Sequence, residues 1–401
     1  MKILIVCQHY YPEQFLLNDI ATELVRRGND VTVLAGLPNY PEGKVLSEYR
    51  WGRRRSQIID GVKVIRCFEI GRGRGYFQLG VNYLSYSISA SIKSLFLKGN
   101  FDIVFSYQLS PISMAFPAIL YKKRKKVPVF LYCCDLWPES LKGHVKKPSG
   151  FFYKTLARFS RYVYNAVDVV TVASKPFIEY MQKVNEVPAS VLRYRPQYAS
   201  GYLMKEDLTA EDNGIVDFMF AGNFGYDQDL DVIIKAAGAL RERSDFRVHL
   251  VGFGARLEAL KELVKKEKLE DKVTFHGRVP FDEMGKFYKK ADALLITLRC
   301  INEIGKTMPT KLETYMTTGK PIFGAINGAA EEVIRESDCG RTVRAGDYMG
   351  LANLMKDYIE HPENYIHCGE NAKQYFADNF TLEGHVDWLE GEFRQLAGMV
   401  R

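Results

Sequence analysis

The residues with the most evident chemistry lie at 308–315, in Met-Pro-Thr-Lys-Leu-Glu-Thr-Tyr. Pro309 suits the first turn of a helix, where its missing N–H costs nothing. The free N–H groups of that turn can bind an anion such as a diphosphate, and they would be those of Thr310, Lys311 and Leu312. Glu313, one turn in, can accept hydrogen bonds from the two hydroxyls of a ribose. The segment predicts a nucleotide site; an ordinary amphipathic helix with a solvated glutamate is the alternative.

A second pair of carboxylates follows an apolar segment at 127–132 that we expect to be a strand. Asp135 and Glu139 come after this segment, and parallel sheets bind ligands at the carboxyl ends of their strands. Asp135 is the first candidate for polarising a ligand hydroxyl, and Glu139 is the second. The alternative for Asp135 is that it caps the turn that follows.

Two series of alternating strands and helices must position these residues. The run at 3–7, the amphipathic helix from Leu16 to Arg27 and the strand at 30–35 open a parallel, doubly wound α/β sheet. Further strands are expected at 62–66, 102–106, 127–132 and 168–172, then at 216–221, 247–251, 272–275, 292–297 and 320–323. The expected domains are residues 1–195, residues 196–378 and a C-terminal helix in 379–401 that returns to the first domain.

Length and composition are those of a soluble protein with two domains, at 401 residues, 47% hydrophobic and 26% charged. Seven cysteines without a CxxC pair indicate reduced thiols rather than a disulfide framework or a zinc site. We expect no signal peptide, and no apolar run reaches the ~20 residues of a membrane-spanning helix. These features favour a cytoplasmic protein.

The net charge of +7 hides an asymmetry between the two halves. Residues 1–200 carry 29 basic against 14 acidic side chains, whereas residues 201–401 carry 26 against 34. The basic half should be attracted to an anionic membrane surface. Nucleic acid is the competing partner, but no helix-turn-helix, zinc-finger or RNA-recognition signature is present. We therefore expect membrane contact and no nucleic acid.

Several nucleotide-enzyme classes are excluded by missing motifs. A dinucleotide enzyme would have GxGxxG after its first strand, where this chain has Gln-His-Tyr-Tyr-Pro-Glu at 8–13. Neither a Walker loop nor an HExxH motif occurs. The nucleotide site must belong to another class.

Four segments together resemble the bacterial retaining glycosyltransferases of the GT-B fold, family four (group 1), over essentially the whole chain. The resemblance is strongest to the branch that builds O-antigen and capsular polysaccharides. The segments are Tyr10–Glu13 with 21–43, Asp135–Ser140, Phe220–Asn223 with 230–233, and Lys311–Pro321. The resemblance implies two Rossmann-like domains facing a cleft, with a nucleotide-sugar held by the second domain and an acceptor held by the first.

The resemblance also assigns donor-binding residues. Glu313 matches the family's ribose-binding glutamate, whereas the first glutamate of its motif is replaced by Gly305. Gly222-Asn223 stands where the family has Gly-Arg, and Gln228 stands in a region that usually carries lysine. Lys306 and Lys311 are our first candidates for the missing phosphate cations, and Arg299 and Arg193 are alternatives. The backbone of Gly277, Arg278 and Val279 matches the segment that reads the base edge.

On the acceptor side, Glu13 and Asn18 are the candidates for contact. Retaining transfer in this family is described as front-face attack, in which the departing diphosphate helps to deprotonate the acceptor. Lys306 joins Asp135 and Glu139 as a candidate catalytic residue on this basis. No metal or other cofactor is needed for that chemistry. The triplet Asp227-Gln228-Asp229 has the spacing of a DxD metal motif, but its place before a helix favours a turn and N-cap role.

The resulting interpretation is a cytoplasmic, peripheral-membrane transferase. It would move a sugar, an N-acetylated hexosamine, from a UDP-sugar to a polyprenyl-diphosphate-linked glycan. Segments 77–97 and 151–164 could lie in the membrane interface or face the core. The alternatives are a nucleotide-sugar epimerase of the same fold, a phosphorylase, and a sugar-nucleotide-binding scaffold without turnover.

Overall fold

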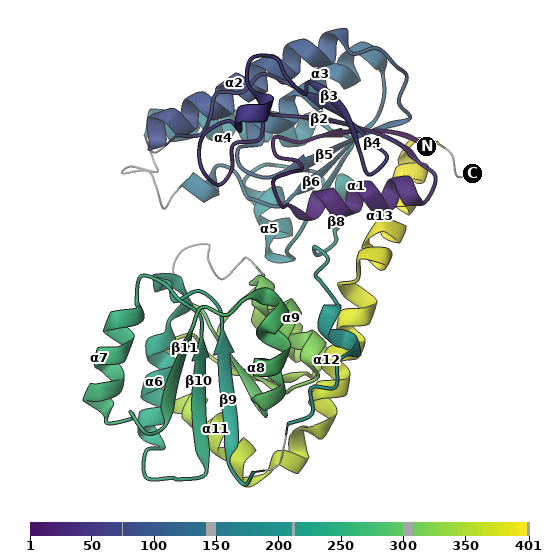
Figure 1. The fold of residues 1–401 in the computed structure, drawn as a ribbon. Coiled ribbons are helices and arrows are strands. Elements are labelled where there is room, and N and C mark those ends of the chain that lie inside the picture. Colours follow the sequence, from purple (N-terminus) through teal and green to yellow (C-terminus); the bar gives the residue numbers. More distant parts are fainter. Residues whose placement is uncertain (74, 142–149, 211–212, 300–307, 399–401) are drawn as a thin grey trace. The chain divides into compact units, whose positions relative to one another are not determined.

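The computed structural model describes residues 1–73, 75–141, 150–210, 213–299 and 308–398. The chain forms two compact units, Met1–Gln197 with Leu382–Arg401, and Tyr198–Thr381 (Figure 1). These boundaries lie two and three residues beyond the expected 195/196 and 378/379. The second difference has a physical cause, because Phe380 is buried in the core of the second unit and its carbonyl accepts the Ala199 N–H at 2.9 Å.

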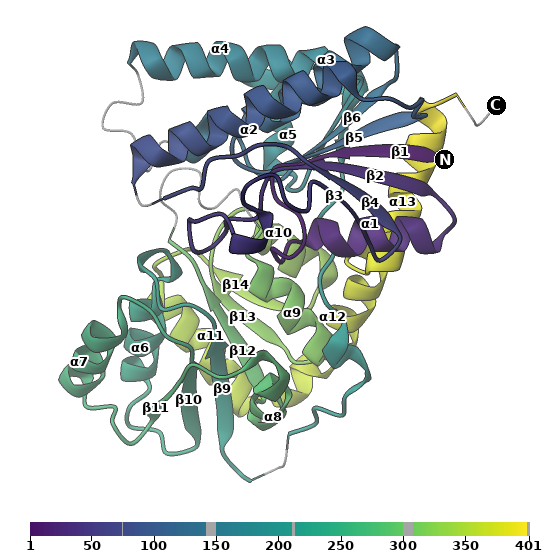
Figure 2. The same cartoon turned by 45° about the horizontal axis from the view of Figure 1, so that its top comes forward.

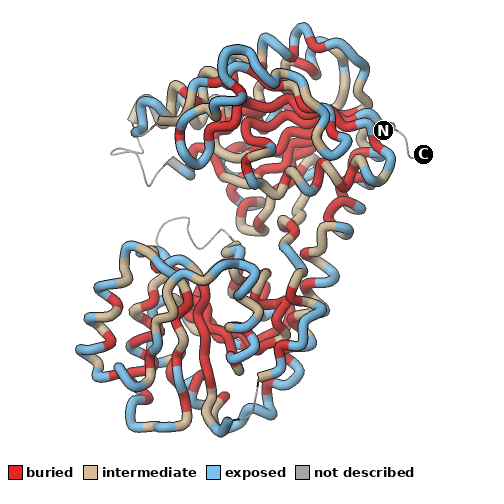
Figure 3. Tube along the Cα trace, viewed as in Figure 1, coloured by how far each residue is buried: buried red, intermediate tan, exposed pale blue. Residues whose placement is uncertain are grey.

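The described part of the first unit contains an eight-stranded sheet in the order β3-β4-β2-β1-β5-β6-β7-β8. All neighbouring pairs are parallel except β3 with β4. Apolar strands such as β1 and β6 are buried almost throughout, as expected for strands covered on both faces (Figure 3). The strands are β1 (Lys2–Val6), β2 (Asp30–Ala35), β3 (Ser56–Ile59), β4 (Val62–Arg66), β5 (Ile103–Gln108), β6 (Val129–Cys133), β7 (Val169–Val172) and β8 (Leu192–Tyr194).

Six α-helices in the described part of this unit cover its sheet (Figures 1 and 2). They are α1 (Leu16–Arg26), α2 (Tyr76–Phe96), α3 (Phe116–Lys125), α4 (Phe151–Ala166), α5 (Pro176–Lys183) and α13 (Leu382–Leu396). The return of the last helix to the first unit is confirmed. Phe393 of α13 packs against Phe105 and Phe130, with ring centres 5.3 and 5.2 Å apart.

The second unit is built around a parallel sheet in the order β11-β10-β9-β12-β13-β14. Alternate residues of its strands enter opposite hydrophobic clusters: Phe218 and Phe220 face one, and Met219 and Ala221 face the other. The strands are β9 (Val216–Ala221), β10 (Phe246–Val251), β11 (Val273–Gly277), β12 (Ala293–Thr297), β13 (Ile322–Ala325) and β14 (Gly340–Val343). The helices are α6 (Leu230–Ala239), α7 (Leu257–Glu267), α8 (Met284–Lys290), α9 (Thr310–Thr318), α10 (Ala329–Ser337), α11 (Tyr348–Glu360) and α12 (Ile366–Asn379).

Two doubly wound α/β units therefore agree with the expected fold class. Across the described ranges, none of the helices combines the length and the apolar character needed to cross a bilayer.

Candidate functional site

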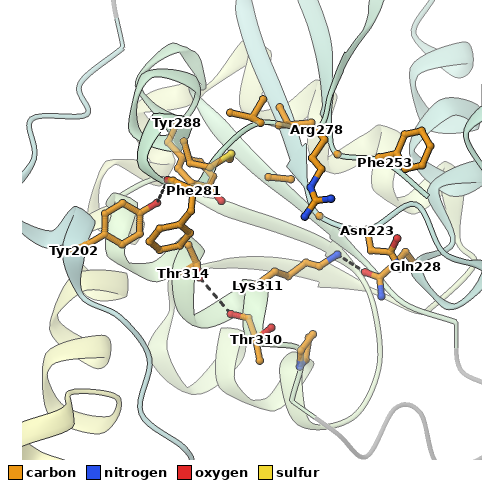
Figure 4. Close-up of a pocket in the computed structure, with 17 residues that line it drawn as sticks. Tyr202, Asn223, Gln228, Phe253, Arg278, Phe281, Tyr288, Thr310, Lys311 and Thr314 are labelled. Carbon is orange, nitrogen blue, oxygen red and sulfur yellow. Dashed lines mark hydrogen bonds between the residues drawn. The ribbon is translucent and has the colours of Figure 1, made fainter. Parts of the chain in front are cut away.

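A pocket of about 720 Å³ opens in the second unit, where β9, β10 and β11 end and α9 begins (Figure 4). This is the carboxyl edge of a parallel sheet, the usual place for a ligand. Of the ten predicted donor-binding residues, those that line it are Gly222, Asn223, Arg278, Val279, Pro309, Thr310 and Lys311. The other three, Gly277, Leu312 and Glu313, lie next to lining residues in the sequence but do not line the pocket themselves.

Glycines allow the backbone to approach closely on the floor of the pocket. Gly222 has φ +155°, and a Cβ there would meet Lys311 Nζ at 3.0 Å. Gly252 has φ +141°, and its Cβ would meet the Gly222 carbonyl at 1.8 Å. Only glycine fits these two positions, because any side chain would fill the space beside Lys311 or collide with backbone.

Helix α9 supplies the predicted anion cradle in a modified form. Pro309 is the N-cap of α9 rather than its first helical residue. The Leu312 N–H donates to the Pro309 carbonyl at 3.0 Å, so this amide is already paired and the Leu312 side chain is buried in the core. The prediction that three free amides form the cradle was therefore wrong for Leu312. The amides of Thr310 and Lys311 remain available at the helix start.

Tyr315 fixes α9 to the sheet. Its hydroxyl accepts the N–H of Ala221 at 2.8 Å and donates to the carbonyl of the same residue at 3.2 Å. Ala221 is the last residue of β9, so this contact sets the position of the helix start against the strand end.

Lys311 is a buried cation at this helix start. Its ammonium lies 3.9 Å from the ring centre of Phe220 and donates a hydrogen bond to the Gln228 amide oxygen. Neither partner carries a negative charge, and burial lowers the pKa of Lys311 to about 7. An anion in the pocket would restore the charge of this lysine.

Arg278 provides a second cation, which the sequence assigned only a backbone role. Figure 4 shows its side chain directed toward the part of the pocket where Lys311 lies. Among the described residues, no hydrogen-bond or ion-pair partner of its guanidinium exists, so it is available to an anionic ligand.

Glu313, the predicted ribose ligand, is only 5% exposed. No partner of its carboxyl occurs within the described part of the chain, and burial raises its pKa well above the usual value. A carboxyl left unpaired in this position is destabilising unless a ligand completes it. Its role in binding ribose remains a prediction.

The other predicted cations are not in the pocket. Arg299 forms an ion pair with Asp229 at 3.0 Å, and Arg193 belongs to the first unit, where it contacts Glu392 at 3.3 Å. Lys306 and Gly305 lie outside the described residues. Asp229 occupies the N-cap position of α6, but its side chain binds Arg299 instead of capping the helix.

The opposite end of the pocket is aromatic and apolar. Tyr202 and Phe281 lie with ring centres 4.4 Å apart, and Tyr288 lies at the same end (Figure 4). Val279 and Met284 also line the pocket. A flat base fits this end, and a diphosphate fits the end with the cations and amides. Across the described residues, no group of His, Cys, Asp or Glu side chains could hold a metal ion.

The first unit holds the acceptor-side candidates, and Asp135 lies two residues beyond β6, as the sequence predicted. Its carboxylate accepts the Ser110 hydroxyl at 3.0 Å, and that hydroxyl accepts the Trp137 indole N–H at 2.9 Å. Burial raises the pKa of Asp135. Within the described residues the side chain makes no hydrogen bond to the following turn, so the capping alternative is not observed.

We expected Glu139 to be a catalytic candidate, but its carboxylate is instead engaged by other side chains of the first unit. One carboxylate oxygen accepts the hydroxyls of Tyr153 at 3.0 Å and Tyr180 at 2.6 Å. The side chain therefore joins α4 to α5.

Glu13 and Asn18 are also engaged inside the protein. The Glu13 carboxylate accepts the N–H groups of Asn39 and Tyr40 at 2.8 and 2.7 Å and pairs with His9 at 3.0 Å. Asn18 donates to the Glu13 carbonyl at 2.7 Å. Glu13 holds the loop after β2 in place, and Asn18 holds the segment before α1. The expectation of direct acceptor contact has no support in this geometry.

A buried carboxyl nearby, Glu69, was not predicted from the sequence. One of its oxygens accepts amide N–H groups from Gln8, Asn39 and Asn82 at 2.8, 3.1 and 2.6 Å. Its other oxygen has no partner in the described residues, and burial raises its pKa to about 7. Glu69 lies three residues after β4, so the strand-end argument that selected Asp135 could have found it.

Comparisons with known proteins cover both units of the chain. A family model described as Glycosyl transferases group 1 matches residues 207–375, and one described as Glycosyltransferase Family 4 matches residues 16–196. Between them the two models match most of both units.

Curated relatives match over shorter stretches. N-acetyl-alpha-D-glucosaminyl L-malate synthase of Bacillus anthracis is 27% identical over 158 residues, 39% of this chain and 40% of that protein. Amylovoran biosynthesis glycosyltransferase AmsK of Erwinia amylovora is 26% identical over 128 residues, 31% of each chain. The match therefore spans less than half the length of these relatives.

Anabaena HepE, solved in complex with UDP, has a TM-score of 0.70 at 15% identity over 98% of this chain and 100% of its own. At that identity the likeness shows a common fold.

Proposed function

Since the chain belongs to the group 1 glycosyltransferases of the GT-B fold, we propose that it is a retaining transferase whose donor is a UDP-sugar bound in the second unit. The observation that carries the proposal is the pairing of two cations without acidic partners, Lys311 and Arg278, in one pocket with an aromatic end. A nucleoside diphosphate has the matching shape and charge.

Different residues of the pocket bind different parts of the UDP-sugar. The amides of Thr310 and Lys311, the start of α9 and the two cations bind the diphosphate. Tyr202 and Phe281 receive the base, and Glu313 receives the ribose hydroxyls. UDP is the choice because Anabaena HepE, of the same fold, was solved with UDP.

During transfer the protein must stabilise the negative charge that develops on the leaving diphosphate. The bond between sugar C1 and the diphosphate oxygen breaks, and C1 bonds to the acceptor oxygen on the same face. The acceptor proton passes to the departing diphosphate. Lys311, Arg278 and the α9 amides stabilise the charge that grows on that group, which is where preorganised donors lower a barrier most. Asp135 polarises the acceptor hydroxyl.

We further propose that the sugar is an N-acetylated hexosamine and the acceptor a polyprenyl-diphosphate-linked glycan of a surface polysaccharide. The names of the Bacillus anthracis and Erwinia amylovora relatives, an N-acetylglucosaminyl synthase and a polysaccharide-biosynthesis enzyme, support this choice. Such an acceptor is held by a membrane, so the enzyme would work on the cytoplasmic face of the plasma membrane.

A thermal-shift panel followed by a transfer assay tests the proposal. UDP, GDP, ADP, CMP and UDP-sugars are compared with EDTA present, and the UDP-sugars that stabilise the protein are then incubated with lipid-linked acceptors and analysed by mass spectrometry. The proposal predicts stabilisation by UDP species and a product larger by one sugar. UDP binding without transfer to any acceptor would instead favour a sugar-nucleotide-binding scaffold. If no nucleotide changed the melting temperature, the assignment of the donor site would be wrong.

A further inference from the structure

Helix α2 presents large apolar side chains to solvent, whereas most of its buried residues are polar. Its buried residues are Asn82, Tyr86, Ser87, Ala90 and Ser94. Large hydrophobic residues point outward, between 41% and 84% exposed, and we call them the α2 stripe: Phe77, Leu84, Ile88, Ile92 and Leu95. A surface helix of a soluble protein normally has the opposite arrangement.

The α2 stripe is continuous along the helix. Its members follow one another at steps of seven, four, four and three residues, which place them on one side of an α-helix. At 1.5 Å per residue the stripe extends over about 27 Å. An exposed apolar face of this length marks a surface that something covers.

The charge of the side chains around the α2 stripe indicates what kind of surface binds it. Helices α2, α3 and α4, which lie together on one side of the unit, contain no aspartate or glutamate (Figures 1 and 2). Lys93, Lys98, Lys154 and Arg158 are exposed and make no ion pair with any described residue. Other basic residues of α3 and α4 are neutralised, since Lys122 pairs with Asp168 at 2.8 Å and Arg161 with Glu186 at 2.9 Å. An apolar face beside basic side chains that form no ion pair is the pattern of helices that lie in the plane of an anionic membrane.

We propose that the α2 stripe inserts into the surface of an anionic lipid bilayer, with the basic residues of α2 and α4 on lipid headgroups. A second copy of the chain is a poorer cover, because a two-fold interface would bring the same basic surfaces against each other. Nucleic acid would leave the apolar side chains uncovered. This membrane contact stands independently of the donor chemistry.

Vesicle co-sedimentation of the full chain tests the proposal. The lipids are phosphatidylcholine alone, or phosphatidylcholine and phosphatidylglycerol in equal parts. The wild type should sediment with the anionic vesicles only. Leu84→Gln/Ile88→Gln/Ile92→Gln should weaken that binding by about tenfold or more, because three exposed apolar groups no longer leave water. Lys93→Gln/Lys154→Gln/Arg158→Gln should weaken it and reduce its dependence on salt.

Matched controls use the same substitutions elsewhere. Ile58→Gln/Ile366→Gln changes side chains that are 79% and 73% exposed, and Lys265→Gln/Lys266→Gln/Lys268→Gln removes equal charge from the second unit. Both should bind vesicles as the wild type does, and all variants should keep the UDP thermal shift if the donor site is right. The proposal is overturned if the wild type ignores anionic vesicles or if the stripe variant binds them unchanged. A dimer in light scattering that the stripe variant dissociates, without vesicle binding, would assign the face to a second copy.

Discussion

The ammonium nitrogen of Lys311 lies 3.9 Å from the ring centre of Phe220, below the glycine turn that follows β9. The ring face stabilises a cation, but burial beside a neutral amide lowers the pKa of Lys311 to about 7. Without a bound anion this lysine therefore loses its proton more readily than an exposed lysine does. A diphosphate would supply the missing negative charge and raise this pKa.

The pH dependence of donor binding follows from this arrangement. Below pH 7 Lys311 is already charged, so the affinity for a UDP-sugar reaches its maximum there and stays level. Above pH 7 binding must take up a proton, and the affinity falls by up to about tenfold per pH unit until the higher pKa of the complex is reached. Calorimetry with UDP-N-acetylglucosamine in buffers of different ionisation enthalpy measures that uptake. Lys311→Met should bind weakly with no slope in this range; an unchanged slope in the variant would assign the proton to another group.

Arg278 should contribute to UDP affinity through its positive charge. Arg278→Gln is expected to lower UDP affinity by about 10- to 100-fold, since it removes a charge-assisted contact to the diphosphate. The salt dependence of binding should decrease as well. Arg247→Gln, at an exposed arginine of β10, is the matched control and should change neither quantity. Equal effects of the two variants would mean that net charge, and not the Arg278 contact, attracts the donor.

Substitutions of Asp135 and Glu139 should have different effects, the first on the transfer rate and the second on the stability of the fold. Asp135→Asn is expected to lower kcat by about 100-fold or more and to leave UDP affinity and the melting temperature near wild type. Glu139→Ala deprives two tyrosine hydroxyls of their acceptor, so it should lower stability by about 1–3 kcal/mol. Transfer rates and melting curves of both variants check this. A reversed pattern would move the acceptor-side role to Glu139.

The hydrogen bonds between Tyr315 of α9 and Ala221 of β9 should position the donor site. Tyr315→Phe leaves the buried Ala221 N–H unpaired, which should destabilise the protein by about 1–3 kcal/mol and weaken UDP binding. Tyr348→Phe is the control, because Tyr348 is an exposed tyrosine of the same unit that does not line the pocket. Melting curves with and without UDP report both effects. A Tyr315→Phe protein that binds UDP normally would make these hydrogen bonds purely structural.

Sequence patterns predicted the central strands of both sheets and missed β3, β8 and β14. All three are edge strands, and they are short and carry polar residues such as those of Gly340–Val343. An edge strand is paired on one side only, so it lacks the continuous apolar run that identified β1 or β9.

A helix start close to Pro309 and the strand-end position of Asp135 could also be predicted, because each follows from local rules, although the helix begins one residue later, at Thr310. The direction of the Arg278 side chain and the contact of Glu139 with two tyrosines could not. These depend on residues from other elements that meet only in the folded chain.

The most direct test is a calorimetric titration of UDP and 2′-deoxy-UDP, with EDTA present, into the wild type and Glu313→Ala. The wild type is expected to bind UDP without metal and to bind the 2′-deoxy ligand about tenfold more weakly, since one hydrogen bond from a ribose hydroxyl is missing. Glu313→Ala should bind both ligands equally weakly, with an unchanged or higher melting temperature because a buried unpaired carboxyl is gone. Wild-type affinity for UDP in Glu313→Ala would contradict the assignment of this pocket as the nucleotide-sugar site.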